Sequence, residues 1–170
     1  SHPVWLVKRW VSRFGREFTE QLMTSNNNKP VLTLRVNRIK TNKEELQGLL
    51  DKVDLKYNPK LHLENFITLE NLTNITDWEY FAKGYFAIQD ESTGFSTRLL
   101  DVKPGMRVLD MCAAPGGKTA DLADLMNNEG EIVAIDRYDA RMKILENNLD
   151  RLGVNNVIPV VANANDYADE

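Results

Sequence analysis

The sequence contains little cysteine, no long apolar segment and no surplus of positive charge. One cysteine in 170 residues excludes an internal disulfide and a cysteine-rich zinc site. No apolar run approaches the ~18 residues of a membrane span, and the first residues show no signal-peptide pattern. The hydrophobic fraction of 42% is ordinary for a soluble globular protein. The sequence therefore predicts a cytoplasmic protein with one domain or two small ones.

The distribution of charge along the chain is more informative than its total. A net charge of −4 argues against a uniformly basic nucleic-acid-binding protein. Residues 1–50 nevertheless carry nine Lys or Arg and four Asp or Glu, whereas residues 101–170 carry seven and thirteen. This asymmetry predicts that an RNA-binding surface lies on the amino-terminal part, although a solvated helix face explains the charge equally well. His2 and His62 have no cysteine or acidic cluster at ligand spacing, so no metal site is predicted.

The pattern around which the chain is organised lies in residues 107–126. A short apolar run leads into a loop of small residues, and apolar residues then recur at helical spacing. This predicts a strand, a tight loop and a helix. In open α/β sheets such a loop lies at the carboxyl end of a strand, where small ligands bind. Pro115, Gly116 and Gly117 let the backbone approach a ligand, and the helix start offers N–H groups to a negative group.

The spacing of the loop distinguishes three possible ligands. A nucleoside-triphosphate loop requires G-x-x-x-x-G-K-[ST], but Cys112 stands at the first glycine position. The dinucleotide pattern G-x-G-x-x-G is absent because Gly116 and Gly117 are adjacent. The remaining ligand is S-adenosylmethionine (SAM), which carries a carboxylate and a nucleoside. A second predicted strand, residues 131–136, ends in Asp136, which is placed to accept hydrogen bonds from ribose hydroxyls.

Helical and strand patterns alternate through the rest of the chain. Helices are predicted at 3–14, 16–24, 41–50, 89–100 and 138–152, and strands at 31–37, near 55–57, at 65–69, 85–88 and 156–161. Thr41 and Glu44 form a predicted capping box. Arg35 is expected to point away from its apolar neighbours, toward solvent or RNA. These patterns predict an α/β protein, with a helical lead-in and a small α/β subdomain in residues 1–88 and the first half of a Rossmann-like sheet in residues 89–170.

Residues 108–119, Val-Leu-Asp-Met-Cys-Ala-Ala-Pro-Gly-Gly-Lys-Thr, resemble motif I of the RNA 5-methylcytosine methyltransferases of the RsmB/Nop/Sun family. Residues 1–10, 33–37 and 84–92 are similar to further signatures of that family, in the expected order. The resemblance implies SAM-dependent methylation of cytosine C5 in RNA. It also implies a partial methyltransferase sheet preceded by an RNA-recognition-like subdomain. The upstream signature most resembles bacterial enzymes that act on small-subunit ribosomal RNA.

The expected cofactor-binding residues lie in the loop and after the second and third strands. They are Cys112, Ala113, Ala114, Pro115, Gly116, Gly117, Lys118, Asp136, Arg141 and Asn163. In the family an acid after the third strand faces the adenine amino group; Asn163 stands at that position here, and Asp166 is the alternative. The expected RNA-binding residues are basic side chains of the amino-terminal part, namely Lys8, Arg9, Arg13, Arg35 and Arg38.

The resemblance also implies how the reaction proceeds. A cysteine thiolate adds to C6 of cytosine, C5 takes the methyl group, and loss of the C5 proton releases the thiolate. The family's two cysteines belong to later motifs, one of them an Asp-Ala-Pro-Cys run, which this sequence does not contain. Cys112 stands in motif I, where it is expected to pack the cofactor loop rather than act as the nucleophile. No catalytic residue is therefore assigned within the chain.

These observations predict the amino-terminal and central piece of a methyltransferase, inactive by itself. The alternative is a non-catalytic RNA-binding module with a vestigial cofactor site. In the family's sheet a fourth strand lies beside the motif I strand. Without it, the piece is expected to expose a sheet edge, and either to self-associate or to have a pliable carboxyl-terminal half.

Overall fold

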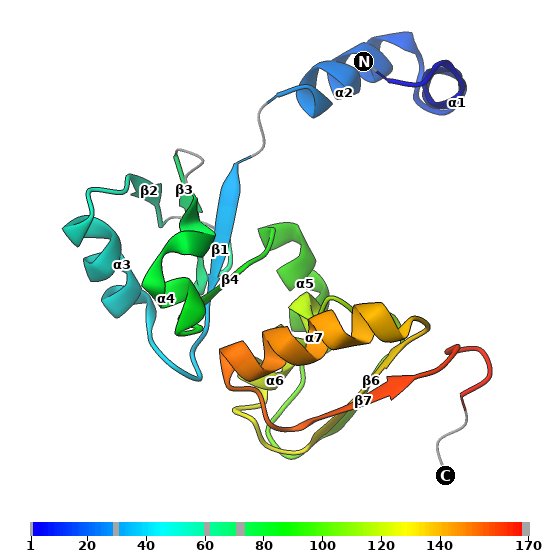
Figure 1. Ribbon diagram of the computed structural model, residues 1–170. Helices are drawn as coiled ribbons and strands as arrows, with labels where there is room; N and C mark the ends of the chain where they lie inside the picture. The colour runs from blue at the N-terminus through cyan, green and yellow to red at the C-terminus, as the bar shows by residue number, and fades with distance from the viewer. Residues whose placement is uncertain (1, 29–30, 60–61, 71–73, 168–170) are drawn as a thin grey trace. The chain divides into compact units, whose positions relative to one another are not determined.

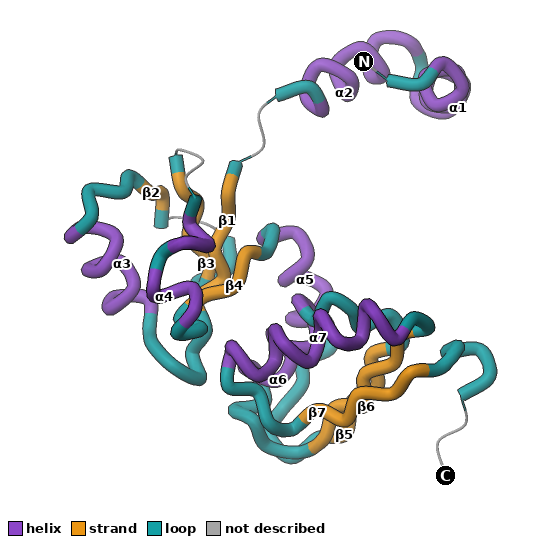
Figure 2. Tube along the Cα trace, viewed as in Figure 1, coloured by secondary structure: helices purple, strands orange, loops and turns teal. Residues whose placement is uncertain are grey.

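The computed structural model describes residues 2–28, 31–59, 62–70 and 74–167 (Figures 1 and 2). The chain divides into two compact units, residues 1–30 and residues 31–170. The first unit is a helical pair, α1 (Val4–Phe14) and α2 (Arg16–Asn26). Gly15 between them adopts a φ of 79°, which favours glycine and ends the first helix. Both predicted helices are confirmed, and α2 is two residues longer than expected.

The first sheet of the second unit is antiparallel, with the strand order β2-β3-β1-β4. Its strands are β1 (Leu32–Val36), β2 (Tyr57–Asn58), β3 (Phe66–Leu69) and β4 (Phe86–Ile88). The helix α3 (Lys43–Lys52) follows β1, and a 3-10 turn η1 (Ile75–Asp77) and a short helix α4 (Glu79–Ala82) precede β4. This β-α-β-β-α-β order is that of a ferredoxin-like fold. The expected small α/β subdomain is present, although η1 and α4 were not predicted.

The central strand β1 is covered on both faces. Leu34 and Val36 point to one face and pack with Leu46 and Leu50 of α3 in a buried apolar cluster. Arg35 lies between them and points to the opposite face, because side chains alternate along a strand. Leu34, Arg35 and Val36 are all fully buried. The alternation was predicted correctly, but the cover over the Arg35 face was not predicted.

The start of α3 lies one residue away from the predicted capping box. Asn42 is the N-cap, and its side-chain oxygen accepts the Glu45 N–H at 2.8 Å. The Thr41 hydroxyl instead donates to the Glu45 carboxylate at 2.7 Å. The capping box predicted for Thr41 and Glu44 is therefore wrong, because Asn42 competes for the same role and lies closer to the first helical turn.

The second sheet is parallel, with the order β5-β6-β7. Its strands are β5 (Arg107–Asp110), β6 (Glu131–Asp136) and β7 (Val157–Val161); α5 (Glu91–Leu99) precedes them, and α6 (Gly117–Leu125) and α7 (Asp139–Leu152) connect them. Figure 1 shows α7 lying along this sheet. Buried residues of both connecting helices, such as Ala123 and Leu145, pack against Ile132 of β6 in one cluster. The predicted fold class, a partial Rossmann-like sheet preceded by a small α/β subdomain, is confirmed.

The two sheets are joined by a buried amide. Asn37 Nδ2 donates to the carbonyl oxygens of Gly84 at 2.7 Å and of Leu152 at 2.8 Å. Gly84 lies just before β4 and Leu152 ends α7, so one side chain connects the antiparallel sheet to the parallel half. The predicted boundary between residues 88 and 89 falls inside this single compact unit. As a division into domains, it stays a prediction.

The strand β5 lies at an edge of the parallel sheet. Large apolar side chains near this edge are exposed, among them Leu100, Leu109 and Met111. Such an edge favours association with another chain, and the expected self-association stays a prediction. Within the described parts of the chain, no helix has the length and apolar character needed to cross a membrane.

We expect Gly84→Ala to lower the free energy of unfolding by about 2–5 kcal/mol. An added Cβ would lie 1.9 Å from the carbonyl oxygen of Arg151, and the residue would still have to hold a φ of 76°. A left-handed backbone costs roughly 1–2 kcal/mol in a residue with a Cβ, and overpacking adds typically about 1–3 kcal/mol. Urea denaturation of both proteins measures the difference.

Gly48→Ala is the matched control for this substitution. Gly48 lies within α3, and an added Cβ would meet no heavy atom within 4 Å. Because alanine is the better helix former, this change is expected to raise the free energy of unfolding by about 0.5–1 kcal/mol. If Gly84→Ala were as stable as the unchanged protein, the close packing of this turn against α7 would be contradicted.

Candidate functional site

The loop between β5 and α6 is fixed at both ends by Asp110. This residue ends β5, and its Oδ2 accepts the Thr119 hydroxyl at 2.8 Å. Its Oδ1 accepts the Cys112 N–H at 3.3 Å. The Ala113 N–H donates to the Ile135 carbonyl at 2.9 Å, which connects the loop to β6. The Asp110 carboxylate therefore connects the start of the loop to the first turn of α6 and fixes the loop conformation.

Asp136 lies at the carboxyl end of β6, beside the loop. Asp136 is only 4% exposed. Its Oδ2 accepts the Ala114 N–H at 3.2 Å and lies 3.4 Å from Arg141 Nη1. Its Oδ1 accepts the Tyr138 N–H at 3.3 Å, and Arg141 Nη2 donates to the Ala114 carbonyl at 2.6 Å. The structure therefore brings together three of the expected residues, Ala114, Asp136 and Arg141. A carboxylate has about four lone-pair sites, so Asp136 retains the capacity to accept a ligand hydroxyl.

The helix that follows the loop begins without a side-chain cap. Its N-cap is Gly116, at a φ of 100°, and no described side chain accepts a hydrogen bond there. The first N–H groups of a helix lack partners within the helix and carry partial positive charge. A ligand carboxylate therefore fits this end of α6. The N–H groups at the start of α6 are donors that fit the carboxylate of SAM. The Asp136 carboxylate is an acceptor that fits its ribose hydroxyls.

The other loop residues face two separate cavities. Lys118 is exposed and lines a cavity of about 300 Å³ together with Asp110 and Met111. Residues 115–117 line a second cavity of about 220 Å³ beside Ile88. Neither of these two cavities is lined by all of the expected loop residues. Their contact with a cofactor stays a prediction.

Cys112 and Asn163 are both exposed. Asn163 follows β7, and its Nδ2 donates to the Asp166 carboxylate at 2.8 Å. The two candidates for the adenine contact are thus hydrogen-bonded to each other. The choice between them stays open, and an adenine-binding role for either is still a prediction.

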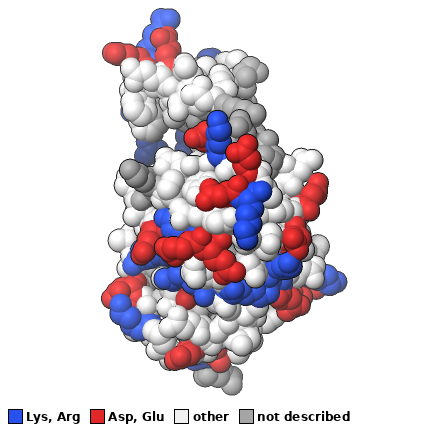
Figure 3. Space-filling view, turned by 90° about the vertical axis from the view of Figure 1, so that its left-hand side faces the viewer, with Lys and Arg blue, Asp and Glu red and all other residues white. Residues whose placement is uncertain are grey.

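The expected RNA-binding residues lie in different surroundings. Lys8, Arg9 and Arg13 are exposed on α1. Arg38 follows β1, with its side chain 47% exposed and its Nε 3.2 Å from Asp124 Oδ2. On the face of the second unit seen in Figure 3, Lys and Arg side chains are interspersed with Asp and Glu. RNA binding by these four residues stays a prediction.

The expectation that Arg35 points toward solvent or RNA is wrong. Its Nε donates to Gln89 Oε1 at 2.8 Å, and its Nη1 lies 3.6 Å from Asp121 Oδ1 and 3.4 Å from Asp124 Oδ2. Its side chain is 1% exposed, because α6, which carries both aspartates, covers this face of β1. Arg98 of α5 completes the cluster, with Nη1 2.7 Å from Asp121 Oδ2.

Burial opposes the charged forms of the groups in this cluster. Desolvation lowers the pKa of Arg35, while Asp121 and Asp124 act in the opposite direction. Desolvation also raises the pKa of Asp124, although Arg38 and Arg35 oppose the shift. Arg35 stays protonated, because a guanidinium keeps its charge in proteins. A hydrogen-bonded ionic cluster therefore joins the antiparallel sheet to α6.

Sequence reasoning did not single out Gln89, Arg98, Asp121 or Asp124. The available signal was the pair of aspartates three residues apart in the small, apolar helix at 117–125. Residues at that spacing share one helix face, and two acids on the packed side of a helix require partners of opposite charge. Two of the three arginine partners, Arg35 and Arg38, lie 86–89 residues away from Asp124 in the sequence, and a local pattern does not contain such contacts.

Two family models match the chain in succession. The model described as Methyltr_RsmF/B-like, ferredoxin-like domain matches residues 2–76, and the model described as 16S rRNA methyltransferase RsmB/F matches residues 97–170. Together they account for most of the chain. The chain belongs to the RsmB/F methyltransferase family. The family resemblance seen in the sequence is confirmed.

Known relatives of this RsmB/F chain agree with that assignment. The probable ribosomal RNA small subunit methyltransferase B of Bacillus subtilis is 37% identical over 154 residues, which cover 91% of this chain and 34% of the relative. The crystal structure of PH0851 has a TM-score of 0.90 at 34% identity and covers 96% of this chain and 37% of that chain. A methyltransferase homolog protein from Pyrococcus horikoshii gives 0.81 at 32% identity, with 95% and 53% covered. The chain thus spans about a third of the length of the curated relatives it matches.

In this RsmB/F chain we expect Arg35→Ala to lower the free energy of unfolding by about 3–5 kcal/mol. The substitution removes the cation that lies between Asp121 and Asp124. Both aspartates are at most 2% exposed. Removing one partner of a buried ion pair typically costs about 3–5 kcal/mol of stability, because the other charge stays buried without compensation. Chemical denaturation followed by circular dichroism gives the value.

Lys143→Ala is the control for removing a paired cation. Lys143 pairs with Asp139 at 2.7 Å, but both side chains are more than 60% exposed. Solvent screens an exposed pair, so stability should change little. A loss in Arg35→Ala no larger than in Lys143→Ala would contradict the structural role assigned to the buried cluster.

Proposed function

We propose that this chain is part of an enzyme that transfers a methyl group from SAM to C5 of cytosine in RNA, specifically in small-subunit ribosomal RNA. Its family membership supports methyl transfer, and the curated relatives are named as ribosomal RNA small subunit methyltransferases. The observation that carries the cofactor assignment is the contact between the loop and Asp136. A hydroxyl acceptor there lies beside an uncapped helix start.

In this proposal the loop and its neighbours bind and orient the cofactor. The first N–H groups of α6 bind its carboxylate, and Asp136 accepts hydrogen bonds from the ribose. Arg141 holds Asp136 and the Ala114 carbonyl in place. Asn163 or Asp166 receives the adenine amino group. When bound, SAM supplies an electrophilic methyl group on a sulfonium.

The RNA-facing part of the proposal concerns the basic residues of the first 50 positions. Lys8, Arg9 and Arg13 are exposed on one helix, where they can bind phosphate groups without reading sequence. Arg38 is half-exposed and already paired with Asp124, so only part of its guanidinium is free to bind RNA. Arg35 is removed from this group because it is buried.

The proposed chemistry requires a cysteine that this chain does not supply. A thiolate of the full-length enzyme adds to C6, C5 takes the methyl group, the C5 proton leaves, and the thiolate departs. Cys112 is exposed within the loop, and its N–H donates to Asp110, so we assign it to the shape of the loop. The chain alone should therefore bind the cofactor without turnover.

Calorimetric titration of the chain with S-adenosylhomocysteine tests this function. We expect binding that Asp136→Ala weakens by at least about tenfold, because a charge-assisted hydrogen bond contributes roughly 1.5–3 kcal/mol. Asp139→Ala is the matched control. Asp139 lies three residues away in an exposed pair with Lys143, and its removal should leave the affinity within about twofold.

Three outcomes of the titration would contradict the proposal. Binding of ATP in place of S-adenosylhomocysteine would indicate a nucleotide-binding loop. Equal binding by the chain and by Asp136→Ala would place the ligand away from this acid. An absence of binding would contradict a cofactor site formed by these residues and favour a non-catalytic RNA-binding module.

A further inference from the structure

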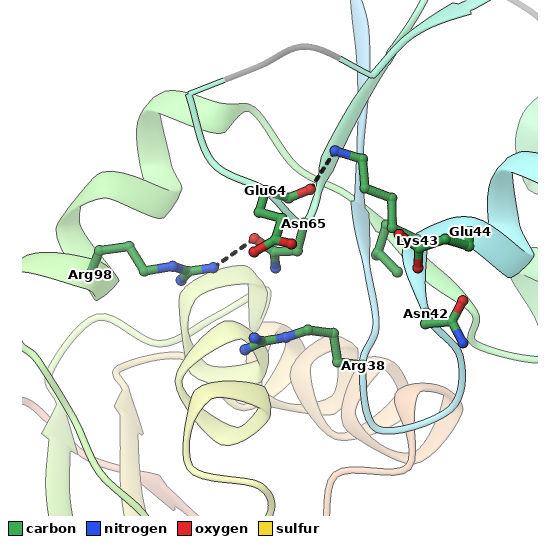
Figure 4. A pocket seen from close by; sticks show the side chains of 8 residues that line it. Arg38, Asn42, Lys43, Glu44, Glu64, Asn65 and Arg98 are labelled. Carbon is green, nitrogen blue, oxygen red and sulfur yellow. Dashed lines mark hydrogen bonds between the residues drawn. The ribbon is translucent and has the colours of Figure 1, made fainter.

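A cavity of about 320 Å³ lies among the end of β1, the start of α3, the segment before β3 and α5 (Figure 4). Its polar lining includes Arg38, Lys43, Glu44, Glu64, Asn65 and Arg98. No described residue of the cofactor loop at 112–118 lines it. The volume is at the lower end of the about 300–1,000 Å³ typical of small-molecule sites. The cavity is therefore separate from the cofactor site and large enough for one small ligand group.

Asn65 lines this cavity and carries a buried hydrogen-bond donor without a partner among the described residues. The residue is 7% exposed, and its backbone carbonyl accepts the Val36 N–H at 2.8 Å. Its Oδ1 accepts Arg98 Nη2 at 2.8 Å, which fixes the orientation of the amide. Its Nδ2 has no hydrogen-bond partner among the described residues. A buried donor without a partner is costly. This nitrogen has less than 1 Å² of accessible surface, so a ligand acceptor pairs with it only if the Asn65 amide shifts toward the cavity.

Two arginines extend this donor surface. Figure 4 shows Arg98 and Arg38 reaching toward Asn65 from two different sides. Arg98 Nη1 lies 2.7 Å from Asp121 Oδ2, and Arg38 Nε lies 3.2 Å from Asp124 Oδ2. These contacts hold both guanidinium groups in place. Each guanidinium has five N–H groups, so each retains donors for a ligand.

Acceptors are present in the same cavity. The Glu64 carboxylate lies next to Asn65 in Figure 4, and Glu44 adds a second carboxylate to the lining. Lys43 Nζ donates to the backbone carbonyls of Glu64 at 2.6 Å and Pro59 at 2.9 Å. Both arginines are already paired with buried aspartates. The cavity therefore combines donors and acceptors with little uncompensated positive charge, which disfavours a phosphate group and favours a neutral polar ligand.

We propose that this cavity binds an unpaired guanine base of the RNA substrate. Guanine presents two adjacent acceptors, O6 and N7, which suit an arginine fork, and two adjacent donors, N1–H and N2–H₂, which suit a carboxylate. Arg98 or Arg38 reads the acceptor edge, and Glu64 reads the donor edge. Uracil offers a carboxylate one N–H, and adenine offers its amino group alone. Unpaired RNA bases are read on these edges once they are splayed from a stack.

This inference rests on the proposed function only in taking RNA as the source of the base. The cavity and the cofactor loop have no lining residue in common, so the two sites can fail independently. Binding of S-adenosylhomocysteine without guanine binding would overturn only the base site. Guanine binding without S-adenosylhomocysteine binding would overturn only the cofactor site.

Nuclear magnetic resonance titration of the ¹⁵N-labelled chain tests the base site. The probes are 5′-GMP, 5′-UMP, inorganic phosphate, and two uridine hexamers, one of which has a single guanine in the third position. We expect GMP to shift the Asn65 side-chain amide with a Kd of about 1 mM, and the guanine-containing hexamer to bind more tightly because its phosphates add contacts. UMP, phosphate and the all-uridine hexamer should leave this resonance unmoved at the same concentrations.

Two isosteric substitutions separate the specific contact from general charge effects. Glu64→Gln removes the carboxylate but keeps the backbone carbonyl that Lys43 binds, and it should weaken GMP binding by about tenfold. Glu70→Gln makes the same charge change just beyond the other end of β3, outside the cavity, and should leave the affinity unchanged.

Several results would overturn the proposal. A shift of the Asn65 amide by phosphate as large as that by GMP would show an anion site instead. Equal binding of GMP and UMP, or equal affinities of Glu64→Gln and the unchanged chain, would remove the base-specific contact. A guanine-containing hexamer that binds no better than the uridine hexamer would exclude RNA as the source of the base. No shift with GMP up to about 10 mM would exclude the site.

Discussion

The second unit depends on one buried ionic contact, that of Arg35 with Asp121 and Asp124 of α6. Each of these three side chains is at most 1% exposed. Moving charged groups out of water costs several kcal/mol of free energy per ion, on the order of magnitude known for buried ion pairs. Hydrogen bonds and ion pairs with Gln89, Arg98 and Arg38 offset part of this cost. Arg35 Nη2, Asp121 Oδ1 and Asp124 Oδ1 have no hydrogen-bond partner among the described residues. A cluster of this kind tolerates few arrangements. It therefore fixes where α6 sits against the antiparallel sheet, in a way that apolar packing alone would not specify.

The position of α6 in turn determines the cofactor loop, because the loop leads directly into that helix. Asp110 at the end of β5 accepts the Thr119 hydroxyl from the first turn of α6. Asp136 at the end of the neighbouring strand accepts the Ala114 N–H. The buried side of α6 thus carries the ionic cluster, and its amino-terminal end carries the candidate site. A change in the cluster should reach the loop through the helix.

The same cluster has a second face, toward solvent. Asp121 and Asp124 hold Arg98 and Arg38 at the cavity that also contains Asn65. One set of buried acids therefore supports both the packing of the two sheets and the polar walls of the proposed base site. This shared use explains why two arginines can remain ordered while part of each stays available to a ligand.

The sequence was sufficient for features that depend on neighbouring residues. The β5–α6 loop and the placement of Asp136 at a strand end follow from periodicity and spacing within about 30 residues. It was also right that Arg35 points away from Leu34 and Val36. What covers that face was not predictable, because α6 lies more than 80 residues further along the chain.

Local ambiguity explains another error, since Asn42 and Thr41 both suit an N-cap and only the backbone geometry decides between them. The Figure 4 cavity combines residues from four separate segments, so no single stretch of sequence contained it.

A crystal structure of this chain with S-adenosylhomocysteine would show directly whether the β5–α6 loop and Asp136 form the cofactor site. We predict that the ligand carboxylate lies at the first N–H groups of α6, beside Gly116, and that a ribose hydroxyl lies within hydrogen-bonding distance of Asp136. The buried Arg35 cluster should be unchanged in that complex. A ligand bound elsewhere, with the loop at 112–117 and Asp136 empty, would contradict this prediction.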